Sequence, residues 1–197
     1  MRQYIAFLRG INVSGRRMKM DRLRALFRAL GLRDVSTFIA SGNVSFSTDS
    51  EDVARVRERI EGHLENQLGY EVATFLRSPA ELASIIAFSP PNAVMPTPSA
   101  WSRFVMFLDP HAPDSLRSTL TELNSEMDHF YFSESEVHWH IKGKLSESPL
   151  FGPGLERATR GVRTTTRNMN TLQRIATKIE AFPIGSSAPP TPVPHLP

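Results

Sequence analysis

Apolar residues in the first half of the chain alternate between strand spacing and helix spacing. Short apolar runs predict four strands, over Gln3–Leu8, Val35–Ala40, Val44–Ser47 and Tyr70–Leu76. Apolar positions three and four residues apart predict two helices. One ends near Gly31, and the other runs from a capping box of Thr48 and Glu51 to Gly69. The order strand, helix, strand, strand, helix, strand is that of the ferredoxin-like, split βαβ unit.

The second half of the chain starts the same pattern again. A helix capped by Ser78 closes the first unit, and a proline-rich stretch over residues 89–98 follows it. The pattern then predicts a strand, a helix and two paired strands, over residues 103–108, 113–123, 130–132 and 137–141. Two further helices are predicted, over Leu155–Thr159 and over Asn168–Ala181, the second capped by Asn168.

This repeated order predicts an α+β protein of two ferredoxin-like (split βαβ) subdomains in tandem, related by a degenerate duplication. We predict the first subdomain with its trailing helix at residues 1–88 and a proline-rich connection at residues 89–102. The second, degenerate subdomain is predicted at residues 103–182, and a flexible proline-rich tail at residues 183–197.

Composition narrows the classes of function that this chain can have. It has 197 residues, of which 40% are hydrophobic, and no cysteine, which excludes disulfides, thiol catalysis and thiolate metal sites. No run approaches the roughly 18 apolar residues of a membrane span. The N-terminus leads into a strand rather than a signal peptide, so we expect a cytoplasmic protein that does not bind membranes.

Charge is distributed unevenly along a chain whose net charge is only +3. Residues 1–33 contain nine Lys or Arg and a single acid, and residues 142–178 contain eight Lys or Arg and two acids. The stretch between them is acidic. If the two basic ends meet in space, they would form one positive face for a phosphate-bearing partner, although solvated arginines on helix surfaces would give the same pattern.

The segment Arg9–Gly15 is the first candidate site, because it places two glycines and polar side chains between a strand and a helix. Backbone amides beside a helix N-terminus and several arginines suit an anion. The glycine spacing matches neither the P-loop nor the dinucleotide fingerprint. The glycines and Asn12 also fit a tight turn in which Asn12 bonds its own backbone.

Three segments together resemble an uncharacterised, mainly bacterial family, the domain of unknown function 1697. They are Leu8–Gly15, Ser41–Val44 and Thr165–Thr171, in an order and spacing that cover about residues 1–181. The resemblance implies two ferredoxin-like subdomains and carries no established activity. Lys144 and Leu145 match a further Ser-Lys-Leu motif, whereas Met169 stands where the family usually has tryptophan.

From these segments we expect a small-molecule ligand carrying phosphate or carboxylate, bound in a cleft between the two halves. The candidate ligand-binding residues are Arg9, Asn12, Gly15, Ser41, Asn43, Lys144, Arg167, Asn168 and Asn170. The alternatives are nucleic-acid binding through the basic termini and a structural or protein-interaction module. The sequence predicts no cofactor and identifies no catalytic residue, so it leaves open whether the protein is an enzyme, and it does not fix the oligomeric state.

Other groups of residues have structural interpretations that compete with functional ones. Ser41-Gly42-Asn43 fits a simple hairpin turn, and Asn168 fits a helix cap. The aromatic residues Trp101, Phe132 and Trp139 fit core packing better than a base-stacking platform. His138 and His140 lie on the same side of one predicted strand, but no third metal ligand accompanies them, so no metal is predicted.

Overall fold

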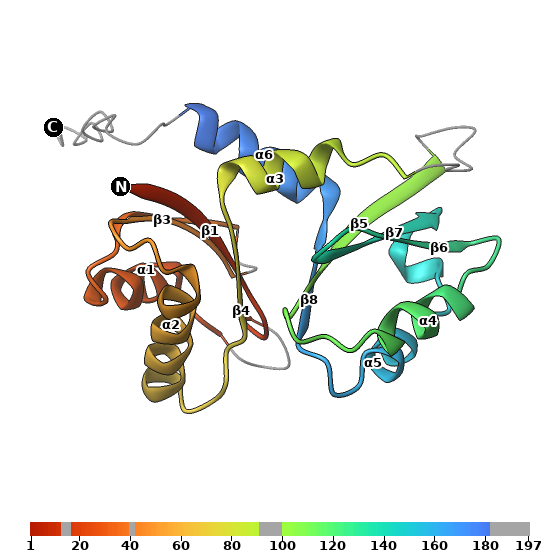
Figure 1. The fold of residues 1–197 in the computed structure, drawn as a ribbon, viewed down its shortest axis with the longest axis horizontal. Coiled ribbons are helices and arrows are strands. Elements are labelled where there is room, and N and C mark those ends of the chain that lie inside the picture. Colours follow the sequence, from red (N-terminus) through yellow and green to blue (C-terminus); the bar gives the residue numbers. More distant parts are fainter. Residues whose placement is uncertain (13–16, 40–41, 91–99, 182–197) are drawn as a thin grey trace, which may run out of the picture.

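The computed structural model describes residues 1–12, 17–39, 42–90 and 100–181, and one series of elements occurs in it twice (Figure 1). The first series is β1 (Arg2–Leu8), α1 (Met20–Ala29), β2 (Arg33–Phe38), β3 (Asn43–Thr48), α2 (Val53–Leu68), β4 (Thr74–Arg77) and α3 (Pro79–Ala87). The second is β5 (Trp101–Leu108), α4 (Ser115–Glu122), β6 (Asp128–Phe132), β7 (Glu136–Lys142), α5 (Pro153–Ala158), β8 (Thr164–Asn168) and α6 (Met169–Ala181), with a 3₁₀ turn, η2 (Leu145–Glu147), after β7.

Each series forms its own four-stranded antiparallel sheet. The strand orders are β2-β3-β1-β4 and β6-β7-β5-β8, so each strand of the second sheet occupies the place of the strand four earlier in the first. This is the order of the ferredoxin-like unit in both halves. The predicted α+β fold with two tandem ferredoxin-like subdomains is therefore confirmed, whereas the exact boundaries at residues 88, 102 and 182 stay predictions.

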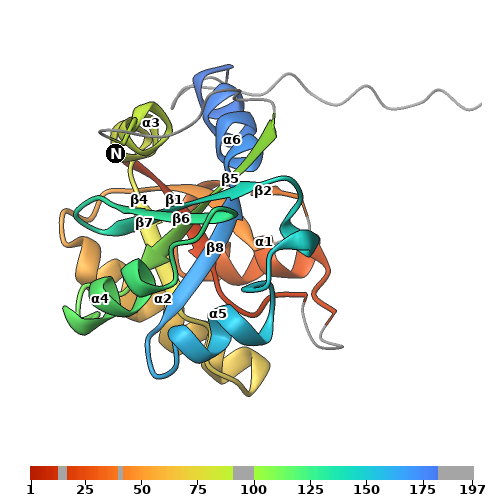
Figure 2. The same ribbon diagram turned by 90° about the vertical axis from the view of Figure 1, so that its right-hand side faces the viewer.

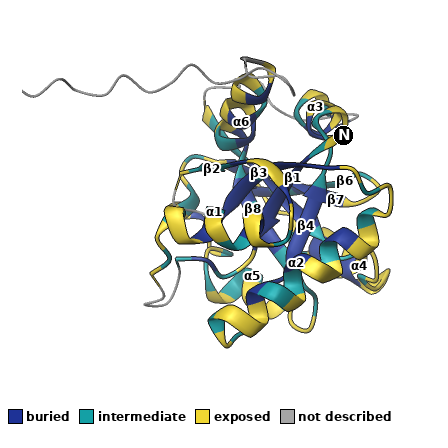
Figure 3. Cartoon of the chain, turned by 90° about the vertical axis from the view of Figure 1, so that its left-hand side faces the viewer, coloured by how far each residue is buried: buried dark blue, intermediate teal, exposed yellow. Residues whose placement is uncertain are grey.

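Two helices cover the outer face of each sheet (Figure 2). On the first sheet, α2 buries Val56, Ile60 and Leu64 at helical spacing, while α1 buries Leu23 and Phe27. On the second, α4 and α5 pack over a cluster that contains the buried Trp139. Figure 3 shows the result, with buried strands inside and exposed outer faces on α1 and α2. The core interpretation of Trp139 is thus confirmed.

The inner faces of the two sheets share a middle core with α3 and α6, which lie side by side above it (Figures 1 and 2). The rings of Phe7 from β1 and Phe107 from β5 stack here, with centroids 4.3 Å apart and planes 13° apart. Met169, the residue in place of the family's usual tryptophan, is 2% exposed in this core. It is a packing residue in this protein.

Two predicted boundaries in the first half are wrong. The capping box of Thr48 and Glu51 does not form, because β3 continues through Thr48. Asp52 caps α2 instead by accepting a hydrogen bond from the backbone N–H of Arg55. The strand predicted from Tyr70 begins only at Thr74 and ends at Arg77. Apolar character at residues 70–73 serves packing rather than strand pairing, since Val72 and Ala73 are buried.

The sequence reading also missed β8, the strand that completes the second sheet. Its run of threonines is typical of strands, because β-branched side chains favour extended backbone. The sequence predicts Asn168 as the cap of the following helix. The structure confirms this, because Asn168 Oδ1 accepts a hydrogen bond from the backbone N–H of Asn170. The cap and the end of β8 coincide, which leaves no turn between strand and helix.

No helix of the described ranges is both long and apolar enough to cross a membrane. Within the same ranges, no three His, Cys, Asp or Glu side chains are grouped so as to hold a metal ion. His138 and His140 do lie on one side of β7, and both are buried, at 1% and 3% exposure.

Burial dominates the electrostatics of this histidine pair. It lowers the pKa of His138 from 6.5 to about 4, with smaller contributions from His140 and Arg103. The pKa of His140 falls to about 4 for the same reason, with contributions from Arg103 and His129. Both imidazoles are therefore neutral at pH 7, and their low pKa values cost stability only at a pH where the unfolded chain is protonated.

We expect the free energy of unfolding to decrease as the pH falls from 6.5 to about 4. In this window the unfolded chain binds protons that the folded chain does not, at about 1.4 kcal/mol per pH unit for each histidine. Urea unfolding at several pH values measures the slope, and His138→Phe should reduce it. His111→Gln, at an exposed position, is the control. Equal slopes for both variants would contradict the assignment.

Candidate functional site

A pocket of about 440 Å³ lies at the junction of the two halves, where residues of the first and third motif segments line it. We call it the junction pocket. Its described lining residues come from the end of β1, from the end of β2, from β8 and from the first turn of α6: Leu8, Gly10, Ile11, Asn12, Ile39, Thr165, Thr166, Arg167, Asn168 and Thr171. Residues that are more than 150 positions apart in the sequence therefore line the same pocket.

Arg167 is the central polar residue of this pocket and is only 8% exposed. Its guanidinium donates hydrogen bonds to oxygens of both halves: Asn43 Oδ1 (2.6 Å), Thr165 Oγ1 (2.7 Å), Thr166 O (2.9 Å), Leu8 O (2.7 Å) and Gly42 O (3.5 Å). Burial lowers the pKa of the guanidinium to about 10, so it remains a cation at neutral pH. Arg167 therefore joins the three motifs and also places a positive charge at the junction.

Within the second motif, Ser41–Val44, Asn43 and Gly42 have clear structural roles. Asn43 is 1% exposed, accepts the bond from Arg167 and donates through Nδ2 to Phe38 O. Gly42 has φ +72°, and a Cβ atom on it would lie 3.0 Å from Ile11 Cβ. Because the chain before β3 passes so close to the Leu8–Asn12 segment, a side chain at this position would be both strained and crowded. The turn interpretation of this segment agrees with its geometry, and the segment also supports the pocket.

Backbone strain is concentrated beside the junction pocket. Three non-glycine residues of the described chain have positive φ, and two of them, Asn12 (φ 58°) and Ile39 (φ 45°), line this pocket. The side chain of Asn12 accepts a hydrogen bond from the backbone N–H of Met18 and donates one to Met18 O. Ile39 is β-branched, for which this conformation is costly, and its side chain is 48% exposed.

The N-terminus of α6 opens onto the same pocket. Asn168 and Thr171 line it, whereas Asn170 is exposed and is not among the described lining residues. The first-turn backbone N–H groups of a helix have no partners within the helix, and they make its N-terminus positive. This helix has 13 residues, so its dipole adds to the charge of Arg167 at one end of the pocket.

The other candidate residues lie elsewhere. Arg9 is exposed, donates to Val162 O at 3.4 Å and lines a separate basic pocket with Arg160 and Arg163. Lys144 is exposed just after β7, does not line the junction pocket, and uses its backbone N–H to bind Glu147. Gly15 and Ser41 lie outside the described residues.

Several lining residues were not predicted as site residues. Thr165, Thr166 and Thr171 belong to the third motif, so the family resemblance does point to them. They are absent from the predicted site because its candidates from this motif are an arginine and two asparagines. Ile39 carried no such signal, because an isoleucine at the end of a strand gives no sign of positive φ.

Comparison with known proteins agrees with this fold. A family model described as "Protein of unknown function (DUF1697)" matches residues 1–138, a range that contains the first two motifs. The structure of conserved bacterial protein SP0830 from Streptococcus pneumoniae is similar, with a TM-score of 0.67 and 22% identity over 91% of this chain and 99% of that chain. At this identity the likeness shows the fold alone. Among curated proteins, none matches this chain.

Arg167→Lys should destabilise the protein by roughly 2–4 kcal/mol, because a lysine ammonium cannot reach the same set of oxygens and loses buried hydrogen bonds such as the one to Leu8 O. Urea unfolding measures the change. Arg174→Lys, on the exposed face of α6, is the matched control and should change stability by less than about 0.5 kcal/mol. Equal losses in the two variants would show that Arg167 does not join the halves.

Gly42→Ala and Gly31→Ala separate the cost of positive φ from the cost of close packing. Both glycines have positive φ, at +72° and +76°, but no atom lies within 4 Å of a Cβ at Gly31. Positive φ alone costs alanine about 1–2 kcal/mol. Gly42→Ala should therefore lose roughly 1–3 kcal/mol more than Gly31→Ala, through the contact with Ile11. Thermal or urea unfolding of both variants gives the difference, and equal costs would contradict the close approach.

Proposed function

This chain belongs to the family described as proteins of unknown function (DUF1697). From that premise, and from the geometry of the site, we propose that the junction pocket binds a small molecule carrying a phosphate or carboxylate group. One observation carries the proposal: residues of the first and third motifs line a 440 Å³ pocket, and its wall includes the buried Arg167, which is held by hydrogen bonds to the second motif.

Charge favours an anion over a neutral ligand in this pocket. A buried charge acts through a low effective dielectric constant, so the field of Arg167 is stronger in the pocket than that of a surface arginine. The hydrogen bonds of Arg167 to protein oxygens fix its position, so its contribution to binding is mainly electrostatic. The positive end of α6 acts in the same direction.

Direct contacts to the ligand would come from the start of α6. The hydroxyl of Thr171 and the side-chain amide of Asn168 belong to the pocket wall, and both can donate hydrogen bonds to an oxyanion. Strained residues such as Ile39 support a binding role, because costly backbone conformations are concentrated at ligand sites.

Ligand screening by thermal unfolding tests this proposal. Inorganic phosphate, nucleotides, sugar phosphates, acyl carboxylates and short RNA form the panel. A ligand at 100 times its dissociation constant should stabilise the wild type by about 2.7 kcal/mol. Thr171→Val should weaken the affinity about tenfold, because it removes one hydrogen bond to a charged group.

Thr177→Val is the matched control, since the same substitution is made on the same helix at an exposed position away from the pocket. It should bind like the wild type. The proposal fails if no small anion raises the melting temperature. It also fails if both threonine variants bind equally well, and stabilisation by short RNA alone, lost steeply as salt increases, would favour nucleic-acid binding instead.

A further inference from the structure

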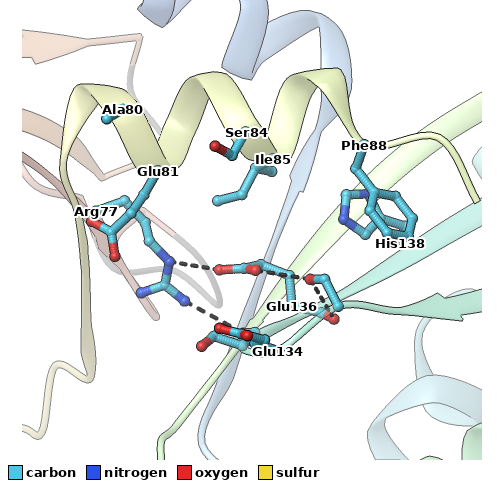
Figure 4. Close-up of a pocket in the computed structure, with 11 residues that line it drawn as sticks. Arg77, Ala80, Glu81, Ser84, Ile85, Phe88, Glu134, Glu136 and His138 are labelled. Carbon is cyan, nitrogen blue, oxygen red and sulfur yellow. Dashed lines mark hydrogen bonds and ion pairs between the residues drawn. The ribbon is translucent and has the colours of Figure 1, made fainter.

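A second pocket, of about 410 Å³, lies on another part of the junction between the halves, and we call it the α3 pocket. Its walls come from the end of β4, from α3 and from the hairpin between β6 and β7. Figure 4 shows Arg77 and Glu81 at one end, His138 and Phe88 at the other, and Glu136 between them. No described residue lines both this pocket and the junction pocket.

His138 is the feature that points to a ligand. Its side chain belongs to the wall of the α3 pocket and is 1% exposed, and neither of its ring nitrogens has a hydrogen-bond partner in the structure. The ring of Phe88 stacks on it at 4.0 Å between centroids and covers one face of the imidazole. Buried polar atoms in folded proteins are nearly always hydrogen-bonded. A polar group of a ligand would supply the hydrogen bond for the imidazole of His138.

The charges around the α3 pocket favour a cation. Arg77 is already paired, since its Nε donates to Glu136 Oε1 at 2.6 Å and the two side chains are 12% and 8% exposed. Two further carboxylates, Glu81 and Glu134, line the pocket at exposed positions. Glu81 accepts one hydrogen bond, from the backbone N–H of Ser78. The carboxylates therefore outnumber the one cation of the wall.

We propose that the α3 pocket binds a small organic amine or guanidinium compound, with an N–H of the ligand donating to the imidazole of His138 and the carboxylates of Glu81 and Glu134 facing its positive charge. A neutral imidazole offers a lone pair to such a donor without repelling it. The burial that keeps His138 neutral at pH 7 therefore prepares the acceptor. This site is independent of the anion site proposed for the junction pocket, and it takes the opposite charge.

Isothermal titration calorimetry with agmatine, spermidine and arginine tests the α3 pocket, and glutarate serves as an anion of similar length. We expect saturable binding of at least one amine at pH 7.5 and none of glutarate. His138→Phe keeps the stacked ring and removes both nitrogens, and it should weaken the affinity about tenfold. Glu134→Gln changes only an exposed charge and should weaken it about two- to fivefold.

Glu122→Gln is the matched control, because it removes an exposed carboxylate from α4 that does not line the pocket. It should bind like the wild type. Thermal unfolding of each variant establishes that it is folded, and ¹⁵N shifts of the histidine rings report contact at His138 directly. The proposal is overturned if no amine binds. Equal weakening by Glu134→Gln and Glu122→Gln, with full affinity in His138→Phe, would also overturn it by showing attraction to the surface alone.

Discussion

The middle core, in which the inner faces of the two sheets pack against each other, is the constraint on which the rest of the structure depends. Each ferredoxin-like sheet covers its outer face with its own helix pair, but its inner face is also apolar. The stacked rings of Phe7 and Phe107 come from equivalent strands of the two halves. Separating the halves would expose this layer to water, at a cost proportional to the apolar area. The duplicated halves therefore form one folding unit with a shared interior.

Arg167 lies at the margin of this middle core, and it links fold and site. Its guanidinium is 5.9 Å from the centroid of the Phe7 ring and bonds to Leu8, Gly42 and Asn43 of the first half. The structural interpretation of the three motifs and the functional one are therefore not exclusive. The same hydrogen bonds that align the two halves hold a positive charge in the wall of the junction pocket.

Both pockets lie where elements of the two halves meet. The junction pocket combines a buried guanidinium with a helix N-terminus, whereas the α3 pocket combines carboxylates with a neutral histidine. The arginine of the α3 pocket is neutralised by Glu136, while Arg167 bonds to carbonyl, hydroxyl and amide oxygens. This difference in the partners of the two arginines underlies the opposite ligand charges that we propose for the two pockets.

The sequence by itself determined the repeated order of elements, except for β8, and most helix ends, because apolar spacing and capping act within a few residues. Asn168 as a cap and the buried stripe of α2 are examples. Only the tertiary structure decided which motif residues share a pocket. Arg167 bonds to Asn43, 124 positions away, and Ile39 takes a left-handed conformation that its residue type disfavours. Such contacts depend on how two sheets pack together, and no local pattern of side chains records that.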